Sequence, residues 1–183
     1  MKPVSELSRK ELAGLVCETL TEAGIDVVLV GGSCVSIYTN EVFVSLDLDF
    51  VALGSVSNKR IANALVAIGF GSKKSNARYF EHPDTSLTLE FPPSPVMLGD
   101  EYVPESKVDE MHTSVGTLKL LRPTDCVKDR LANYYYGGDQ QCYQQALMVA
   151  AKHPVDWKAL ERWHENEGEA ERFPGFRHDV KSL

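Results

Sequence analysis

Between Ser8 and Gly24 the apolar residues recur every three or four positions, which predicts an amphipathic helix. Ser8 and Glu11 have the spacing of a capping box at its start, and Gly24 is a natural helix end. The next run, Ile25–Val30, is short and mostly apolar, which is typical of an inner strand. We therefore expect this first helix to pack on a sheet.

The stretch Val27–Val51 predicts a strand, a Gly-Gly-Ser turn, a short helix over Ser33–Tyr38 and a second strand over Val42–Val51. Side chains two positions apart in a strand point to the same face. Asp47 and Asp49 should therefore face one way together. We expect the alternate residues of this strand to face the core: Leu46, Leu48 and Phe50.

The segment after this strand predicts a helix from the Ser57 cap to Ile68, ended by Gly69, and then a hairpin over Arg78–Phe91. The second arm of the hairpin has the sequence SLTLEF and repeats the Leu-x-Leu-x-Phe pattern of residues 46–50. If these two strands lie side by side, Glu90 joins the two aspartates on one face.

The rest of the chain predicts mostly helices. We first expect an irregular proline-rich segment at 91–104 and a hairpin around Val115–Gly116. Two helices should follow, one from Pro123 to Tyr136 closed by Gly137–Gly138, and one capped by Asp139 and stopped by Pro154. The chain should end with a helix that has Trp157, Leu160 and Trp163 on one face, and with a polar, frayed tail from Glu165.

The composition is that of a globular protein: of 183 residues, 43% are hydrophobic and 25% are charged. This length suits one domain or a domain with a helical appendage. The net charge of −7 argues against tight nonspecific binding to nucleic acid. A local basic patch of Lys73, Lys74 and Arg78 remains open, with a solvated hairpin as the plainer interpretation.

The cysteines and histidines do not have the spacing of a zinc site, because there is no Cys-x-x-Cys pair and the five histidines are scattered. We expect four free, mostly buried thiols in a reducing compartment: Cys17, Cys34, Cys126 and Cys142. The N-terminus has no apolar signal core, and no run is long enough to cross a membrane. The expected location is the cytoplasm.

Three acidic residues and a glycine turn suggest chemistry at phosphates. Magnesium is held by carboxylates that leave positions open to phosphate oxygens, and Asp47, Asp49 and Glu90 supply such ligands. Backbone amides after a glycine turn bind anions, so residues 31–33 are candidates for the triphosphate: Gly31, Gly32 and Ser33. Taken alone, an Asp-x-Asp pair is more often a solvated strand face, a Gly-Gly pair a tight turn, and a lone glutamate in a hairpin an exposed residue. Here the strand, the glycine turn, the helix and the acidic strand follow one another in the order that this chemistry requires.

These motifs resemble a known superfamily. GGS, a step of fourteen residues from Ser33 to Asp47, and then DLDF are similar to the signature of the polymerase-beta type nucleotidyltransferases, with Glu90 of TLEF at the place of the third acidic residue. The stretches LEFPPSP and PTDCVKDRLANYYYGGDQQCYQQAL resemble small bacterial proteins of the abortive-infection toxin type, some known only as uncharacterised nucleotidyltransferases. The resemblance covers roughly residues 25–150.

The resemblance implies an α+β (α/β) nucleotidyltransferase fold, a mixed twisted sheet flanked by helices, with a core at 1–122 and a helical region at 123–183. It implies transfer of a nucleoside monophosphate from an NTP to a hydroxyl, with Mg²⁺ or Mn²⁺. The implied acceptor is a tRNA or a protein, and a toxin of this type would have a cognate antitoxin. In similar enzymes a basic residue of the helical part reaches the phosphates, and Lys128 and Arg130 match that place. The alternative is a solvated helix face shared with Asp125 and Asp129.

Other functions fit the same residues. A small-molecule nucleotidyltransferase acting on an aminoglycoside would suit an acidic cleft and the net charge of −7. A non-catalytic nucleotide-binding module is motivated by CVSIYTN, which lacks the basic residue common after Gly-Gly-Ser in toxins of this type. A calcium-binding surface at Asp47 and Asp49 is disfavoured because the glycines and spacing do not match an EF-hand loop.

Overall fold

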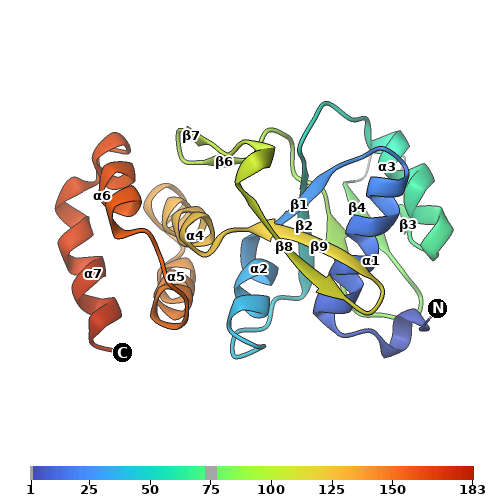
Figure 1. Ribbon diagram of the computed structural model, residues 1–183, viewed down its shortest axis with the longest axis horizontal. Coiled ribbons are helices and arrows are strands. Elements are labelled where there is room, and N and C mark those ends of the chain that lie inside the picture. The colour runs from blue at the N-terminus through green and yellow to red at the C-terminus, as the bar shows by residue number, and fades with distance from the viewer. Residues whose placement is uncertain (1, 73–77) are drawn as a thin grey trace.

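A mixed seven-stranded sheet is the centre of the computed structural model, which describes residues 2–72 and 78–183 (Figure 1). In spatial order its strands are β3 (Gly71–Ser72), β4 (Tyr79–Glu81), β5 (Thr88–Glu90), β2 (Asp47–Ala52), β1 (Val27–Val30), β9 (Gly116–Leu121) and β8 (Val108–Thr113). β2 runs antiparallel to β1 and parallel to β5, and β1 runs parallel to β9. A separate two-stranded ribbon contains β6 (Met97–Leu98) and β7 (Glu101–Tyr102).

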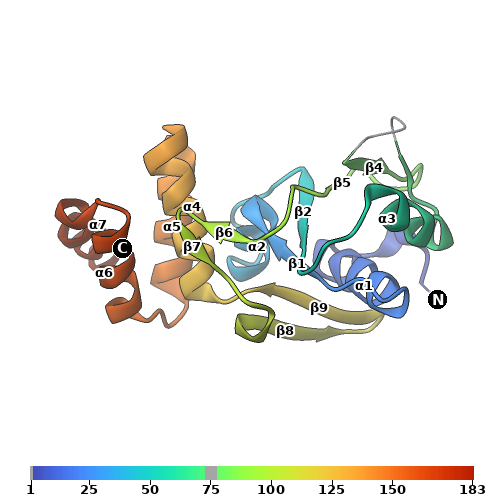
Figure 2. The same ribbon diagram turned by 90° about the horizontal axis from the view of Figure 1, so that it is seen from above.

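The helices cover the sheet and extend beyond one end of it. They are α1 (Arg9–Glu22), α2 (Gly31–Tyr38), α3 (Asn58–Leu65), α4 (Pro123–Gly137), α5 (Gln140–Lys152), α6 (Trp157–Asn166) and α7 (Phe173–Lys181). α1 packs against β9 and α3, whereas α2 packs against β2, α4 and α5. Figures 1 and 2 show α4 to α7 together at the end of the molecule opposite α1 and α3. The expected mixed sheet flanked by helices is confirmed, and the division at residue 122 stays a prediction.

Local signals place most of these elements. The predicted capping box of α1 is formed, since the Ser8 hydroxyl accepts from the Glu11 amide and the Glu11 carboxylate accepts from the Ser8 amide. Asp139 caps α5 as predicted, and Gly138 ends α4 with a left-handed φ of 70°. Both predicted hairpins are present, as β4–β5 and as β8–β9.

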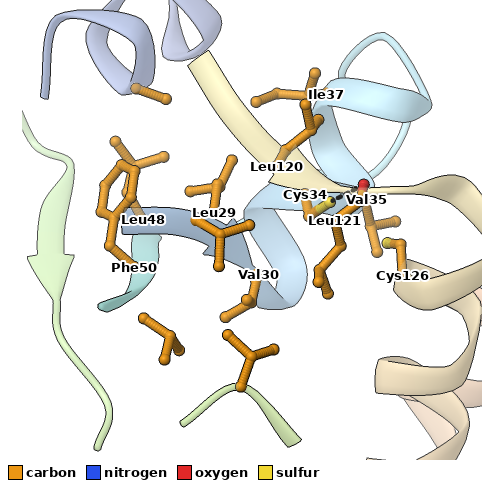
Figure 3. Packing of buried hydrophobic residues seen from close by; sticks show 14 of the residues in the cluster. Leu29, Val30, Cys34, Val35, Ile37, Leu48, Phe50, Leu120, Leu121 and Cys126 are labelled. Atoms are coloured by element: carbon orange, nitrogen blue, oxygen red, sulfur yellow. Dashed lines mark hydrogen bonds between the residues drawn. The ribbon is translucent and has the colours of Figure 1, made fainter. Parts of the chain in front are cut away.

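The core lies between the sheet and its helices (Figure 3). In β2 the apolar residues Leu48 and Phe50 are fully buried, and Phe50 stacks on Phe91 at 5.7 Å between ring centroids. Between β1, β9 and α2 the buried side chains include Leu29, Val35 and Leu120. All four cysteines are buried and free, as expected.

The start of the second strand was predicted wrongly. β2 begins at Asp47, and the preceding Val42 and Leu46 are 65% and 79% exposed. Asn40 and Glu41 both have positive φ values, of 53° and 62°, so the chain turns sharply there and does not enter a strand directly. Leu46 therefore does not point into the core, although Leu48 and Phe50 do.

The predicted frayed tail is also wrong, because residues after Glu165 form α7. Its residues Phe173, Phe176 and Val180 are buried at the spacing of one helix face. Phe176 packs against Trp157 and His164 of α6. The tail is thus part of the helical core.

The structure also bears on the search for a membrane-spanning run and on the possible basic patch. No helix within residues 2–72 and 78–183 is long and apolar enough to cross a membrane. Of the possible basic patch, Lys73 and Lys74 lie outside the described residues, and Arg78 is exposed.

Candidate active site

Strand register brings three carboxylates together at one edge of the sheet. Val30 at the end of β1 pairs with Asp49, and Asp49 pairs with Glu90 in the parallel β2–β5 ladder. Asp47, Asp49 and Glu90 are half-buried, and one carboxylate oxygen from each lies within 4.8 Å of the others. Residues that are distant in the sequence therefore form a single acidic cluster.

Burial and the mutual repulsion of carboxylates dominate the electrostatics of this cluster. Burial, together with the negative charges of Asp47 and Glu90, raises the pKa of Asp49 to about 7. Three oxygen donors in one half-buried cluster match the ligand preference of Mg²⁺ and Mn²⁺. A divalent cation would relieve the repulsion that raises this pKa, so the residues fit such a metal.

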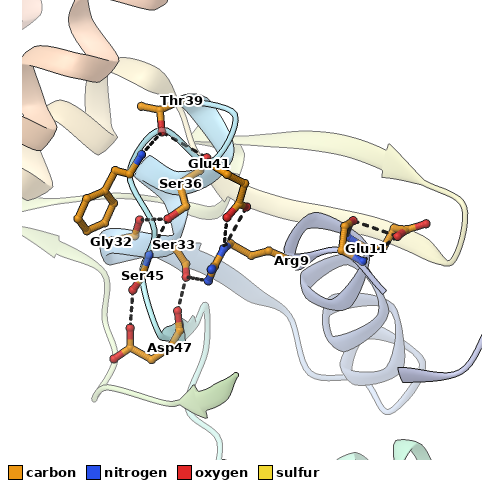
Figure 4. Close-up of polar contacts among 11 residues, drawn as sticks. Arg9, Glu11, Gly32, Ser33, Ser36, Thr39, Glu41, Ser45 and Asp47 are labelled. Atoms are coloured by element: carbon orange, nitrogen blue, oxygen red, sulfur yellow. Dashed lines mark hydrogen bonds and ion pairs between the residues drawn. The ribbon is translucent and has the colours of Figure 1, made fainter. Parts of the chain in front are cut away.

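Hydrogen bonds fix the first aspartate (Figure 4). The Ser45 hydroxyl donates to Oδ1 of Asp47 at 2.6 Å, and the Ser33 hydroxyl donates to the Asp47 carbonyl oxygen. The Ser45 amide in turn donates to the Ser36 hydroxyl at 3.0 Å. These bonds attach the beginning of β2 to α2, so Asp47 is held relative to the helix.

The predicted Gly-Gly-Ser turn is the first turn of α2, since the helix begins at Gly31. Gly31 has a φ of 68°, and a Cβ there would collide with the Asp49 carboxylate, so only glycine allows this approach. The Gly31 amide donates to Oδ2 of Asp129 at 3.1 Å. The first amides of a helix lack partners within it, and here they begin beside the acidic cluster.

Ser33 differs from the two glycines because its side chain is fully buried and already hydrogen-bonded. Its hydroxyl donates to Asp47 and accepts from Nη1 of Arg9 at 3.2 Å, while Nε of Arg9 lies 3.1 Å from both carboxylate oxygens of Glu41 (Figure 4). The Arg9 side chain is only 7% exposed. The contact of Arg9 with Ser33 could not be predicted, because no local pattern indicates a contact across 24 residues.

Arg130 is linked to the cluster through Asp129. Its Nη2 lies 2.6 Å from Oδ2 of Asp129, the same oxygen that accepts from Gly31. Arg130 also donates to Cys142 and Gln145. Its positive charge opposes the rise in the pKa of Asp49. The alternative of a solvated helix face is wrong for this residue, whose side chain is 11% exposed.

Lys128, predicted at the phosphates, is directed elsewhere. Its ammonium lies 2.8 Å from Glu101 and 3.8 Å from Asp125, and its side chain is 5% exposed, so it does not lie on a solvated face either. It lines a pocket of about 500 Å³ together with Arg122 and Asp156, which precede α4 and α6, and with residues of both helices. Two successive residues of α4 thus have different surroundings: Lys128 lines this pocket, whereas Asp129 accepts a hydrogen bond from the Gly31 amide.

Comparison with known proteins gives a structural likeness without a sequence match. No family model and no curated protein sequence matches the chain. An antigenic nucleotidyltransferase-like protein from Paracoccidioides brasiliensis superposes with a TM-score of 0.60 and 13% identity, covering 98% of this chain and 95% of that one. The antibiotic-resistance factor ANT(2'')-Ia superposes with a TM-score of 0.50 and 12% identity, covering 95% and 91%. The fold of this chain is that of nucleotidyltransferase-like proteins.

Proposed function

We propose that this protein is a metal-dependent nucleotidyltransferase that moves a nucleoside monophosphate from an NTP to a hydroxyl acceptor. The observation that carries this proposal is the cluster of Asp47, Asp49 and Glu90, with carboxylate oxygens within 4.8 Å, next to the first amides of α2. Nucleotidyl transfer needs a metal next to the phosphates, and the cluster and the helix start supply both places.

In this proposal Asp47, Asp49 and Glu90 hold Mg²⁺ or Mn²⁺. When bound, the metal neutralises charge on the phosphates. The attacking hydroxyl oxygen forms a bond to the α-phosphorus, and the bond from that phosphorus to pyrophosphate breaks. Glu90, at the outer end of the row, accepts the proton of the attacking hydroxyl.

The triphosphate would bind at the start of α2, where the amides of Gly31, Gly32 and Ser33 carry the positive end of the helix dipole. Arg130 is a cation on this side, held next to Gly31 by Asp129. The buried hydroxyl of Ser33 would act indirectly, by holding Asp47. Lys128 has no role here because its ammonium is engaged by Glu101.

For the acceptor we propose a tRNA or a protein hydroxyl, and for the biological role a toxin of a toxin–antitoxin or phage-defence system in a bacterial cytoplasm, with an antitoxin as partner. This rests on the sequence motifs LEFPPSP and PTDCVKDRLANYYYGGDQQCYQQAL. A small aminoglycoside is the second candidate, because ANT(2'')-Ia, an antibiotic-resistance factor, has a related fold and because the net charge of −7 would attract a cationic drug.

The test uses α-labelled NTPs, Mg²⁺ and a cell extract, with the protein and RNA fractions counted separately. We expect label in one fraction with the wild type and none with Asp47→Ala. Asp84→Ala, an exposed aspartate in the turn of the Glu90 hairpin, is the matched control and should act as the wild type. A parallel reaction with tobramycin in place of the extract tests the second candidate. Equal labelling by Asp47→Ala, or none by the wild type in either reaction, contradicts the proposal.

A further inference from the structure

The row of residues that contains the acidic cluster extends one strand further than the three carboxylates. Tyr79 of β4 lies directly opposite Glu90 of β5 in the antiparallel ladder, and Glu90 pairs with Asp49 of β2. Residues directly opposite in neighbouring strands point to the same face of a sheet. Tyr79 therefore continues the row on the face of the carboxylates.

Burial on the two faces agrees with this placement. The next residues along the same strands are Phe80, Leu89 and Leu48, which are 1%, 0% and 0% exposed and point into the core. Tyr79 is 43% exposed, and it is the direct cross-strand neighbour of Glu90. This aromatic ring borders the cluster, and the core packing of its strand does not require it.

Position within the row separates two sides of the site. Gly31, where we place the triphosphate, follows β1 on one side of Asp49. Glu90 and Tyr79 lie on the other side, toward the sheet edge that ends in β3. An acceptor that approaches the proposed metal from the side opposite the triphosphate therefore meets Glu90 and Tyr79.

We propose that Tyr79 is a further residue of this site, with its hydroxyl orienting Glu90 and its exposed ring forming the contact surface for the acceptor. This inference rests on the proposed function. A phenol that donates to a carboxylate restricts its rotation and leaves the second oxygen directed at the cluster. The ring offers an apolar face, which suits an acceptor whose hydroxyl is carried by a sugar or another ring.

The first experiment needs no catalysis and uses Tb³⁺ as the probe. Tb³⁺ prefers oxygen ligands, as Mg²⁺ and Ca²⁺ do, and it emits when a nearby excited phenol transfers energy to it. We expect tyrosine-sensitised emission from the wild type, competed by Mn²⁺, and loss of most of it in Tyr79→Phe. Tyr102→Phe, which changes an exposed tyrosine of β7 outside the main sheet, is the matched control. Unchanged emission from Tyr79→Phe overturns the placement.

The second experiment is a double-mutant cycle on label transfer with Tyr79→Phe and Glu90→Gln. If Tyr79 acts through Glu90, Tyr79→Phe lowers transfer roughly tenfold or more in the wild type and has little further effect in Glu90→Gln. Additive losses overturn the positioning role. Tyr79→Leu, which removes the ring, should also raise the extract concentration needed for half-maximal labelling, whereas Tyr79→Phe should not. An equal half-maximal concentration in both variants overturns the contact with the acceptor.

The two arms also separate this inference from the proposed function. Sensitised emission that depends on Tyr79, without label transfer by the wild type, would retain a metal site bordered by Tyr79 and reject the transferase. Label transfer with emission that is independent of Tyr79 would retain the transferase and reject the role of Tyr79.

Discussion

The amide of Gly31, the first residue of α2, donates a 3.1 Å hydrogen bond to Asp129 of α4, 98 residues further along the chain. A carboxylate oxygen thus occupies the position at the helix start where the proposed function places a phosphate oxygen. The same oxygen is paired with Arg130, so this part of the site contains a matched anion and cation. Its binding properties depend on that pair.

Replacing Asp129 with asparagine should strengthen NTP binding about tenfold, because Arg130 then faces the phosphates without its counter-charge. The free energy of unfolding should fall by on the order of 2 kcal/mol, because a mostly buried guanidinium loses its ionic partner. Calorimetric titration with a non-hydrolysable NTP and urea denaturation measure the two effects. Asp84→Asn is the control, and unchanged or weaker NTP binding by Asp129→Asn would be contrary to this view of the pair.

The raised pKa of Asp49 predicts an unusual pH dependence of stability. Its folded-state pKa of about 7 exceeds the ordinary value of 3.8, so the folded protein binds a proton more tightly than the unfolded chain does. The contribution of this group to stability therefore falls as the pH rises from about 4 to about 7. Without metal at pH 8, Asp49→Asn should raise the free energy of unfolding by on the order of 2 kcal/mol, and at pH 4 it should have little effect.

Bound metal should reverse the order of stability of the wild type and Asp49→Asn at pH 8. Mg²⁺ at pH 8 should raise the melting temperature of the wild type and leave that of Asp49→Asn almost unchanged, since the variant lacks one of three ligands. Thermal melts at both pH values, with and without Mg²⁺, give the four comparisons. A variant that is less stable than the wild type at pH 8 without metal would contradict the electrostatic account.

Gly31→Ala should remove metal-dependent activity, because the φ of 68° disfavours alanine and the new methyl group meets the Asp49 carboxylate. The loss of stability should be about 1–3 kcal/mol. The control is Gly54→Ala, where an added Cβ meets nothing within 4 Å. Activity assays and denaturant melts on both variants test this, and full activity in Gly31→Ala would show that the close approach is not needed.

Phe176→Ala tests whether the C-terminal helix belongs to the core. The side chain is 1% exposed and packs on Trp157 and His164, so its truncation should cost about 3–5 kcal/mol of stability. Lys181→Ala, at an exposed position of the same helix, should cost little. Equal stability of both variants, measured by urea denaturation, would fit a frayed tail instead.

Sequence patterns predicted the elements that have strong local signals. The Ser8–Glu11 capping box, the Asp139 cap and the alternation in SLTLEF each follow from neighbours a few residues apart. The placing of Glu90 beside Asp49 also followed, because two strands with the same apolar alternation bury the same face. The alternation predicted a shared face for the three carboxylates on the condition that the two strands are neighbours, and the structure shows that they are.

Features that depend on distant contacts were not predictable in this way. The Arg9–Ser33 and Asp129–Gly31 bonds join residues whose neighbours give no sign of them. Leu46 fits the alternation of β2, but the chain turns at Asn40 and Glu41, which have positive φ values, and the strand begins only after Leu46. The Leu46 side chain is therefore exposed. The segment after Glu165 is polar in composition, yet it contains three buried residues at helical spacing. A helix this short is stable only when it packs against another element, here α6, and the sequence does not show that contact.

If Asp47, Asp49 and Glu90 hold one divalent metal ion, Mn²⁺ anomalous diffraction from crystals of the protein should locate that ion among them. We predict a strong anomalous peak within roughly 2.5 Å of oxygens from all three carboxylates, and no peak there in crystals of Asp49→Asn. A wild-type map without a peak among these side chains, at Mn²⁺ concentrations that saturate binding in solution, would show that the three carboxylates are not the metal site.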